Sequence, residues 1–290
     1  MSAELTSIVQ LVLYGLVAGS VYALMAVGFT LIYGVARVFH IAHAGVFTTA
    51  GYVAYTMVAL CRWPVGLGFG VAIVVASLLG LAIHLAVYRP LERLGADPLV
   101  MIVASIGVLT VMENGLAMIF SNTPRFLGGS LKQARVLGAV SVTDVQIAIV
   151  LVAVIAFGAV RVFLARSEFG TEIRAVTDNR YRASVVGIPR DLVSASVYLI
   201  GSAFAAVAGI SVAIDGAALP YRGTPYLLKA AIASILGGVG SINGAFLAAY
   251  LLGLLENVSN VVLPSEWRSS LVFFVFAVMV VVRPKGLFGS

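Results

Sequence analysis

The residues best able to do chemistry in this chain are two carboxylates, each followed by an amide. Glu113-Asn114 and Glu256-Asn257 lie within or close to long apolar stretches. An ionised carboxylate is costly in lipid, so both pairs are expected to face protein or water. Proton coupling is one role for such a carboxylate. Solvation of a helix end or hydrogen bonding between helices is the alternative that we favour.

Histidines form a second candidate group. His40 and His43 are three residues apart beside an apolar run, so they could share a helix face and bind a metal or relay protons. No acidic residue and no third ligand of suitable spacing lies near them, so no metal site is predicted. A role in a pathway or at a helix end stays open beside simple hydrogen bonding. The isolated His84 is expected to be structural, and Lys229 and Arg222 are interpreted as loop or interface residues.

Motifs for catalysis or nucleotide binding are missing from the sequence. The run Gly238-Val239-Gly240 lacks the strand–turn–helix context of a dinucleotide loop and the Lys-Ser/Thr of a phosphate-binding loop. The single Cys61 excludes a disulfide within the chain and a cysteine metal cluster. No Ser/His/Asp or Cys/His set has an interpretable spacing. An intramembrane enzyme therefore has no positive support.

Charge is concentrated in one segment, residues 166–191, which holds nine of the thirty charged residues. Its charges alternate in sign, and several small residues lie between them. A short helix of this kind suits insertion into a groove on a cytosolic partner. A solvated basic loop that only sets membrane topology is the alternative, and the residues alone do not decide between them.

The elements that must position these residues are predicted from composition. Hydrophobic residues make up 61% of the 290 and charged residues 10%, against about 25% charged in a soluble domain. Apolar runs of about 20 residues, the length that crosses the bilayer as helix, recur throughout. This predicts an all-α, polytopic transmembrane helical bundle forming one domain over 1–290. The expected spans are 8–33, 41–60, 66–88, 99–120, 143–164, 192–214, 228–262 and 267–283.

The seventh run decides how many crossings there are. At 228–262 it is too long for one span, and a Gly-rich segment near 237–244 breaks it. One bent helix, a re-entrant hairpin or two short crossings would each fit. Glu4 before the first run and Arg37 after it favour an outside N-terminus, and Arg283 and Lys285 favour a cytoplasmic C-terminus. An odd number of crossings follows, so we favour two passes there within a total of about 8–9.

Other basic and small residues fit this topology with one exception. The loop with Arg125, Lys132 and Arg135 falls outside, against the positive-inside rule. The net charge of +6 comes from short loops, so it does not suggest nucleic-acid binding. The stripe Gly15, Gly19 and Ala23 lies on one helical face, where small residues let helix backbones approach. Packing within the chain is expected there, with a dimer or pore face as the alternative.

The order and spacing of several short motifs, nearly end to end, resemble the permease of branched-chain amino acid ABC transporters (the LivH type). The matching residues are Gly15, Gly19-Ser20-Val21-Tyr22-Ala23-Leu24, Ala26, Gly28, Tyr33-Gly34, Ala42-His43, Gly51-Tyr52, Tyr88-Arg89-Pro90, Ser105-Ile106-Gly107, Gly170, Arg174-Ala175, Ala183-Ser184, Gly187-Ile188, Lys229-Ala230, Leu236-Gly237-Gly238, Gly240-Ser241, Gly244-Ala245, Gly253, Glu256 and the ending from Arg283 to Gly289.

The resemblance implies a subunit of an ATP-driven importer in the lipid of the bacterial inner (plasma) membrane. Its partners would be a second related permease subunit or a second copy, two cytosolic ATPase subunits and an external solute-binding protein. ATP and Mg would bind the ATPase subunits, with no cofactor on this chain, because it has no Walker A loop. The cargo would be a branched-chain amino acid or a related small polar, carboxylate or amide solute, moved by alternating access. A stand-alone ion-coupled transporter or channel is the rival interpretation.

The resemblance also implies candidate residues. The cytoplasmic loop 166–191 would carry a coupling helix at about 170–188, although the importer-loop consensus is met only loosely. The ATPase-coupling candidates are Gly170, Arg174, Ala175, Asp178, Arg180, Arg182, Ala183, Ser184 and Gly187. The candidates for a translocation path or gate are Tyr22, His40, His43, Glu113, Asn114, Gly238, Gly240, Asn243 and Glu256. His40 and Ala44 replace an asparagine and a glycine that the family usually has there, which puts a branched-chain cargo in doubt.

Overall fold

The computed structural model describes residues 3–127, 134–137, 140–261, 263–283 and 286–287. Lys132 and Lys285, used in the topology argument above, lie outside this range, as do Phe288 and Gly289 of the terminal motif.

Most of the described chain is helical, as the apolar runs predict. Its helices are α1 (Ala3–Ala36), α2 (His43–Tyr55), α3 (Val65–Ile83), α4 (Arg89–Arg93), α5 (Pro98–Phe120), α6 (Asp144–Arg166), α7 (Glu168–Asp178), α8 (Arg180–Val185), α9 (Arg190–Asp215), α10 (Gly223–Gly237), α11 (Ile242–Val258) and α12 (Arg268–Val282). π-Helical turns at Thr56–Leu60 and His84–Tyr88 extend α2 and join α3 to α4.

A β-hairpin makes the prediction of an all-α fold wrong in one loop. Strands β1 (Ala134–Leu137) and β2 (Val140–Thr143) pair antiparallel. In β2, Val140 and Val142 are buried and alternate with polar residues, the period-two pattern of a half-buried strand. The Gln10 side chain of α1 accepts from the Ser141 backbone N–H at 2.9 Å and donates to its carbonyl at 2.8 Å. The hairpin is thereby attached to the N-terminal end of α1.

Six helical segments of the described chain are long and apolar enough to cross a membrane: 6–36, 65–93, 98–120, 144–166, 190–215 and 242–261. The count of about 8–9 crossings is therefore not established by length and composition. Helix α2, from the expected span 41–60, is mostly buried within the bundle. Helices α10 and α12 have 15 residues each, about 22 Å at 1.5 Å per residue, short of the ~30 Å hydrocarbon layer.

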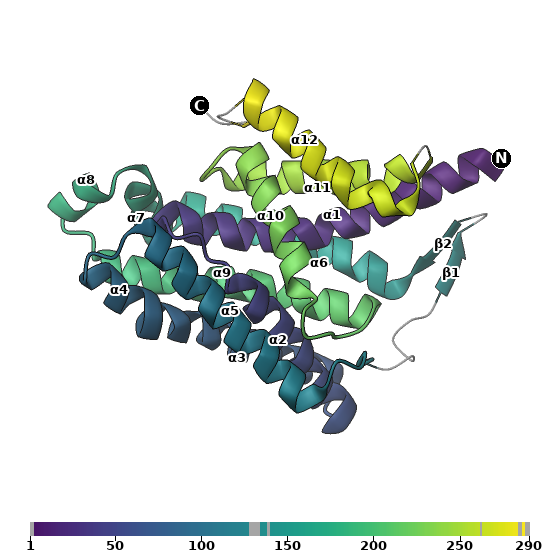
Figure 1. Cartoon of the computed structure of the whole chain (residues 1–290), viewed down its shortest axis with the longest axis horizontal. Coiled ribbons are helices and arrows are strands. Elements are labelled where there is room, and N and C mark those ends of the chain that lie inside the picture. Colours follow the sequence, from purple (N-terminus) through teal and green to yellow (C-terminus); the bar gives the residue numbers. More distant parts are fainter. Residues whose placement is uncertain (1–2, 128–133, 138–139, 262, 284–285, 288–290) are drawn as a thin grey trace.

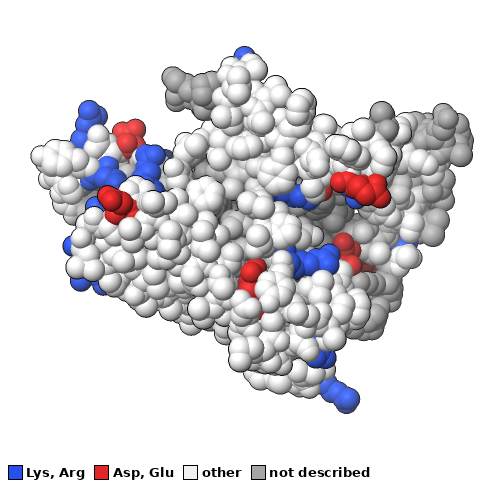
Figure 2. Space-filling model, in the orientation of Figure 1, with Lys and Arg blue, Asp and Glu red and all other residues white. Residues whose placement is uncertain are grey.

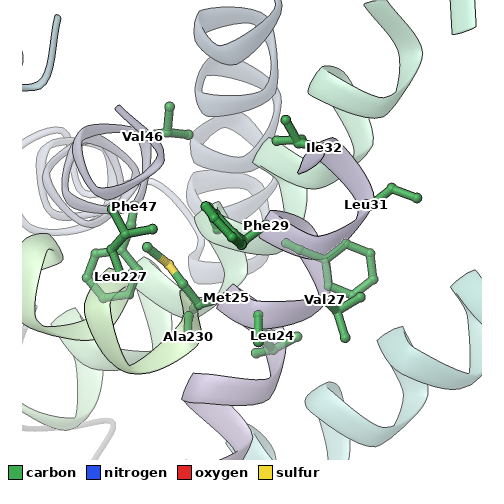
Figure 3. Packing of buried hydrophobic residues seen from close by; sticks show 14 of the residues in the cluster. Leu24, Met25, Val27, Phe29, Leu31, Ile32, Val46, Phe47, Leu227 and Ala230 are labelled. Carbon is green, nitrogen blue, oxygen red and sulfur yellow. The ribbon is translucent and has the colours of Figure 1, made fainter. Parts of the chain in front are cut away.

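Helix α1 runs through the middle of the molecule and packs on α9, α10 and α11 (Figure 1). Its buried side chains, among them Met25, Phe29 and Ile32, meet Phe47 of α2 and Leu227 of α10 in the core (Figure 3). A Cβ added at Gly19 would lie 2.9 Å from the Tyr250 Cα of α11. Side chains there would force α1 and α11 apart. The small-residue stripe therefore serves packing within the chain, as expected.

The Gly-rich segment is a tight turn between two antiparallel helices. Helix α10 ends at Gly237 and α11 begins at Ile242, while Gly238 and Gly240 have φ of 96° and 88°. These angles favour glycine because a Cβ would be strained there. The side chain of Ser241 accepts from the Gly244 N–H at 3.1 Å and caps α11. The break near 237–244 is confirmed, and a single bent helix is excluded.

The molecule has two distinct ends along its long axis (Figure 1). Helices α7 and α8 lie at one end, and the N-terminus and the hairpin lie at the other. We call these the α7–α8 end and the hairpin end. The C-terminal part of α1 belongs to the first, since Gly34 packs beside Thr177 of α7 and Gly240 of the glycine turn. At the hairpin end, Arg125 pairs with Ala218 in an isolated antiparallel bridge.

Candidate functional site

A buried ion pair joins α10 to α11. The Lys229 ammonium lies 2.5 Å from the Glu256 carboxylate, and the two side chains are only 14% and 8% exposed. Tyr22 of α1 completes the group: its hydroxyl donates to Glu256 Oε2 at 2.7 Å and accepts from Lys229 Nζ at 2.9 Å. The ammonium also lies 5.1 Å from the centre of the Tyr22 ring. Helices α1, α10 and α11 are thus joined through two buried charges. Buried charges are strongly destabilising unless they are paired, as these are.

This ion pair forms part of the wall of a cavity of about 580 Å³. Its lining residues Asn122 and Leu219 lie close in sequence to the Arg125–Ala218 bridge of the hairpin end. Two further cations, Arg222 and Arg268, line the same cavity, so its lining holds three cations and one carboxylate. Figure 2 shows charged atoms in the middle of this face, apart from a second group of charges at the α7–α8 end. The rest of the lining is Ala18, Asn122, Leu219, Pro220, Tyr221, Pro225, Tyr226 and Asn257. The volume lies in the range of small-molecule sites.

Lys229 is not a loop residue, because it lies inside α10, where it contacts α1 and α11 at the centre of the candidate site. The signal was present in the sequence: a lysine among apolar helical residues is a functional candidate by default, with a partner to be sought. Arg222 lies in the turn before α10, as predicted, but it also lines the cavity. Tyr22 and Glu256, both predicted, are brought into direct contact here.

Glu113 and Asn114 attach α5 to the start of α10. The Thr224 hydroxyl donates to Glu113 Oε1 at 2.8 Å, and the Tyr221 hydroxyl donates to Asn114 Oδ1 at 3.1 Å. Hydrogen bonding between elements, the favoured alternative, is what these residues do in this structure. Neither lines the charged cavity, although Tyr221 does.

The histidines lie in a separate, fully buried aromatic cluster. His40 Nδ1 is 2.8 Å from the Tyr88 hydroxyl, which donates to the Ser105 hydroxyl at 2.7 Å. The ring of His43 is 5.4 Å from that of His40, and His84 stacks on Tyr198 at 4.5 Å. Among the described residues, no group of three or more His, Cys, Asp or Glu side chains is placed to hold a metal. The cluster joins the π-helical turn after α3, together with α5 and α9, to the start of α2.

Gly238, Gly240 and Asn243 lie at the α7–α8 end rather than beside Glu256. Gly240 lines a small space of about 80 Å³ under α7, together with Gly34 and Thr177. The chain returns to this turn near its C-terminus, where the Leu287 N–H donates to the Leu236 carbonyl at 2.7 Å. The path candidates therefore fall into separate places and do not form one site.

The expected coupling helix at 170–188 is two helices that meet at Asn179. Ser167 caps α7 by accepting from the Gly170 N–H at 2.8 Å, and Asn179 caps α8 by accepting from the Arg182 N–H at 3.0 Å. A Cβ on Gly170 would lie 2.6 Å from the Leu164 Cα, so α7 folds closely back on the end of α6. Gly187 ends the segment with φ of 84°.

Arginines of this segment bind carbonyls at the ends of membrane helices. Arg174 donates to the Leu164 carbonyl near the end of α6, and Arg180 donates to the Val35 carbonyl near the end of α1. In return, Arg37 donates to the Thr177 carbonyl of α7 at 2.9 Å. Cations are favourable at helix C-termini. Burial, followed by the nearby Arg190, lowers the pKa of Arg180 from its ordinary value.

The outward face of α8 is apolar as well as charged. Tyr181, Val185 and Val186 are 78%, 69% and 75% exposed, and Arg182 and Ser184 are exposed beside them. Ala183 is buried, and Ala175 is half-buried. Asp178 is exposed at the end of α7. Large apolar side chains in a charged segment outside the bundle are a common mark of a protein contact.

A helical membrane bundle with a charged cavity inside it has the features of a solute transport protein. Comparison with known proteins gives the family. Residues 11–282 match the family described as branched-chain amino acid transport system, permease component. The LivH permease of Escherichia coli K12 is 31% identical over all of this chain and 98% of its own length. BraD of Pseudomonas aeruginosa is 29% identical over 99% of this chain and 97% of its own length. The chain belongs to this family of branched-chain amino acid transport permeases.

Among solved structures, PsaBC from Streptococcus pneumoniae in complex with Fab aligns over 97% of this chain and 92% of the chain in that structure. The alignment has a TM-score of 0.48 and 13% sequence identity. Family membership makes the chain a multi-pass permease component of an ABC transport system in the inner membrane. It is a transport subunit rather than an enzyme.

Proposed function

We propose that this chain is the permease subunit of an ATP-driven importer for branched-chain amino acids or a related small polar, carboxylate or amide solute. The observation that carries the proposal is the matching family over 11–282. The charged cavity, which Ala18 and Tyr22 in the middle of α1 help to line, and the contact of Arg180 with the C-terminal end of α1 support it. The partners would be a second permease subunit, identical or related, two ATPase subunits that bind ATP and Mg, and an external solute-binding protein.

The topology that we propose has nine membrane segments in one domain. Helices α1, α2, α3, α5, α6, α9, α10, α11 and α12 would cross in alternating directions, with the mostly buried α2 and α10 among the others. Arg37, Arg89 and the 166–191 cluster lie at the α7–α8 end, which makes that end cytoplasmic by the positive-inside rule. The N-terminus and the hairpin are then outside.

The docking contact that we propose is α8. Tyr181, Val185 and Val186 would enter a groove on an ATPase subunit, with Arg182 and Asp178 at the rim. Arg180 faces inward and holds the end of α1, the helix that carries Tyr22. Motion of the ATPase dimer can shift the membrane equilibrium only through contacts that differ between two states. The Arg180–Val35 hydrogen bond is a direct route for that shift.

The test is reconstitution of the whole importer with the Val186→Glu variant. A buried, unpaired carboxylate in the docking groove should lower substrate-stimulated ATP hydrolysis and uptake by at least about tenfold. The matched control is Leu94→Glu, because Leu94 is also exposed, at 82%, in the loop after α4. Equal activity of both variants would contradict docking through α8.

The same preparation separates the importer from its rival, an ion-coupled transporter that would use the buried Glu256. The importer takes up solute only with ATP and ATPase subunits present. Uptake by this chain alone, driven by a proton or sodium gradient, would overturn the proposed function.

A further inference from the structure

The Lys229–Glu256 pair differs from the ion pairs of the molecular surface. In the Arg89–Asp191 pair the side chains are 36% and 62% exposed, which suits a link between helix ends in water. Lys229 and Glu256 are nearly buried, yet both touch a cavity large enough for a small solute. A buried ion pair is weak evidence for stability, because apolar residues of similar volume often serve as well. Its place on the cavity wall suggests a second role.

We propose that Lys229, Glu256 and Tyr22 form a binding site for the ammonium and carboxylate of an α-amino acid, with the protein's own charges paired while the site is empty. This rests on the proposed function and names the chemical class of its cargo. On binding, the cargo ammonium contacts Glu256 and its carboxylate contacts Lys229. The Tyr22 hydroxyl touches both protein charges already, so it can bridge the two halves of the site.

Charge pairing makes such a site selective. A zwitterion replaces one ammonium–carboxylate contact with two, so every charge stays paired in a setting of low dielectric constant. A cargo with a carboxylate alone leaves Glu256 unpaired, and one with an ammonium alone leaves Lys229 unpaired. Removing one partner of a buried pair is far more costly than removing both. A neutral amide cannot compete with the closed pair for either charge.

The rest of the cavity fits the other parts of such a cargo. Leu219, Pro225 and Tyr226 offer apolar surface to a hydrocarbon side chain. Arg222 and Arg268 add positive charge to the lining, which favours entry of the carboxylate.

The experiment uses the whole importer in lipid nanodiscs without the external solute-binding protein, because that protein would itself select the cargo. Binding of radiolabelled L-leucine is measured, with unlabelled competitors that each keep one charge. Leucinamide keeps the ammonium, and 4-methylpentanoate keeps the carboxylate. We expect L-leucine to displace the label at least about tenfold better than either analogue. Equal displacement by all three, or no leucine binding by the unmodified importer, overturns the inference.

Variants assign the effect to this site. Lys229→Met and Glu256→Gln should each weaken leucine binding by at least about tenfold. The double variant Lys229→Met/Glu256→Gln leaves neither charge unpaired, so it should fold even where a single variant does not, and it should lose the preference for leucine. The control is Ser20→Ala, which removes another α1–α11 hydrogen bond, the 2.8 Å contact of Ser20 with Tyr250. It should keep the preference. Unchanged binding in the double variant overturns the inference.

Failure of this inference is distinguishable from failure of the proposed function. ATP-driven uptake into proteoliposomes, with the solute-binding protein present, tests the function alone. Normal uptake by the unmodified importer without discrimination between the competitors rejects only the binding site. Absence of ATP-dependent uptake rejects the proposed function itself.

Discussion

At the scale of single residues, the charged side chains differ in how deeply they are buried and in which groups they contact. Lys229 and Glu256 are 27 positions apart in the chain and meet because α10 and α11 are antiparallel and closely packed. Arg180 and Arg182 are two positions apart and face opposite ways, one to the Val35 carbonyl and one to solvent. The sequence interpretation grouped these two arginines together. In the structure Arg180 forms a link within the permease, whereas the exposed Arg182 is free for the proposed contact with an ATPase subunit.

A stability measurement tests the pairing at this scale. Glu256→Ala leaves the Lys229 ammonium buried without its partner, so it should lower the free energy of unfolding by roughly 3–5 kcal/mol. The double variant Lys229→Met/Glu256→Leu should lie within about 1–2 kcal/mol of the unmodified chain, because neither charge remains. Unfolding in mixed micelles at increasing SDS measures both. A double variant as unstable as Glu256→Ala would contradict this account.

At the scale of elements, short links join the coupling segment to long helices. Helix α7 is held to α6 through Arg174 and Gly170, and to the end of α1 through Arg37. Helix α8 is held to the end of α1 through Arg180. The glycine turn between α10 and α11 lies beside the same contacts, at Gly34 and Thr177. A movement of α7 and α8 would therefore also displace α1. Because Tyr22 of α1 contacts the Lys229–Glu256 ion pair, that movement would be transmitted to the charged cavity.

Arg180→Met is the variant that tests this link. It removes the hydrogen bond to the Val35 carbonyl while keeping an unbranched side chain in a half-buried position. We expect the ATPase subunits to remain bound and active, with solute taken up per ATP hydrolysed lowered by about threefold or more, since a charge-assisted hydrogen bond is worth about 1.5–3 kcal/mol.

The control for this coupling measurement is Arg166→Met, an exposed arginine at the end of α6. Its ratio of uptake to hydrolysis should stay normal. An unchanged ratio in Arg180→Met would show that motion reaches α1 by another route.

At the scale of the whole molecule, the two ends differ in charge and in structure. The α7–α8 end collects arginines and short helices, while the hairpin end carries β1–β2 and residues that line the charged cavity. In the proposed topology the cavity lies on the outer side and the proposed docking helix α8 on the inner side, an arrangement that suits transport from outside to inside. This assignment depends on the orientation of the chain in the membrane, which labelling of a single cysteine can measure.

Cys61 is the single cysteine, and it is exposed in the loop between α2 and α3. The proposed topology places that loop outside. A membrane-impermeant maleimide should therefore label Cys61 in intact spheroplasts. The variant Cys61→Ser/Leu94→Cys, with its cysteine in the loop after α4, should be labelled only after the membrane is opened. The reverse pattern would invert the topology and place the cavity on the cytoplasmic side.

The sequence alone determined the long helices, because a bilayer demands apolar runs of a set length, and each of the six candidate spans lies at one of the expected runs. It also located the glycine break and the charged segment, which depend on local residue types. Only the tertiary structure decided that Lys229 meets Glu256 and Tyr22, because that contact depends on the register between three helices. The same holds for Arg180, whose partner lies 145 residues away. Local patterns describe one helix at a time, whereas a buried charge is explained by the helix that packs against it.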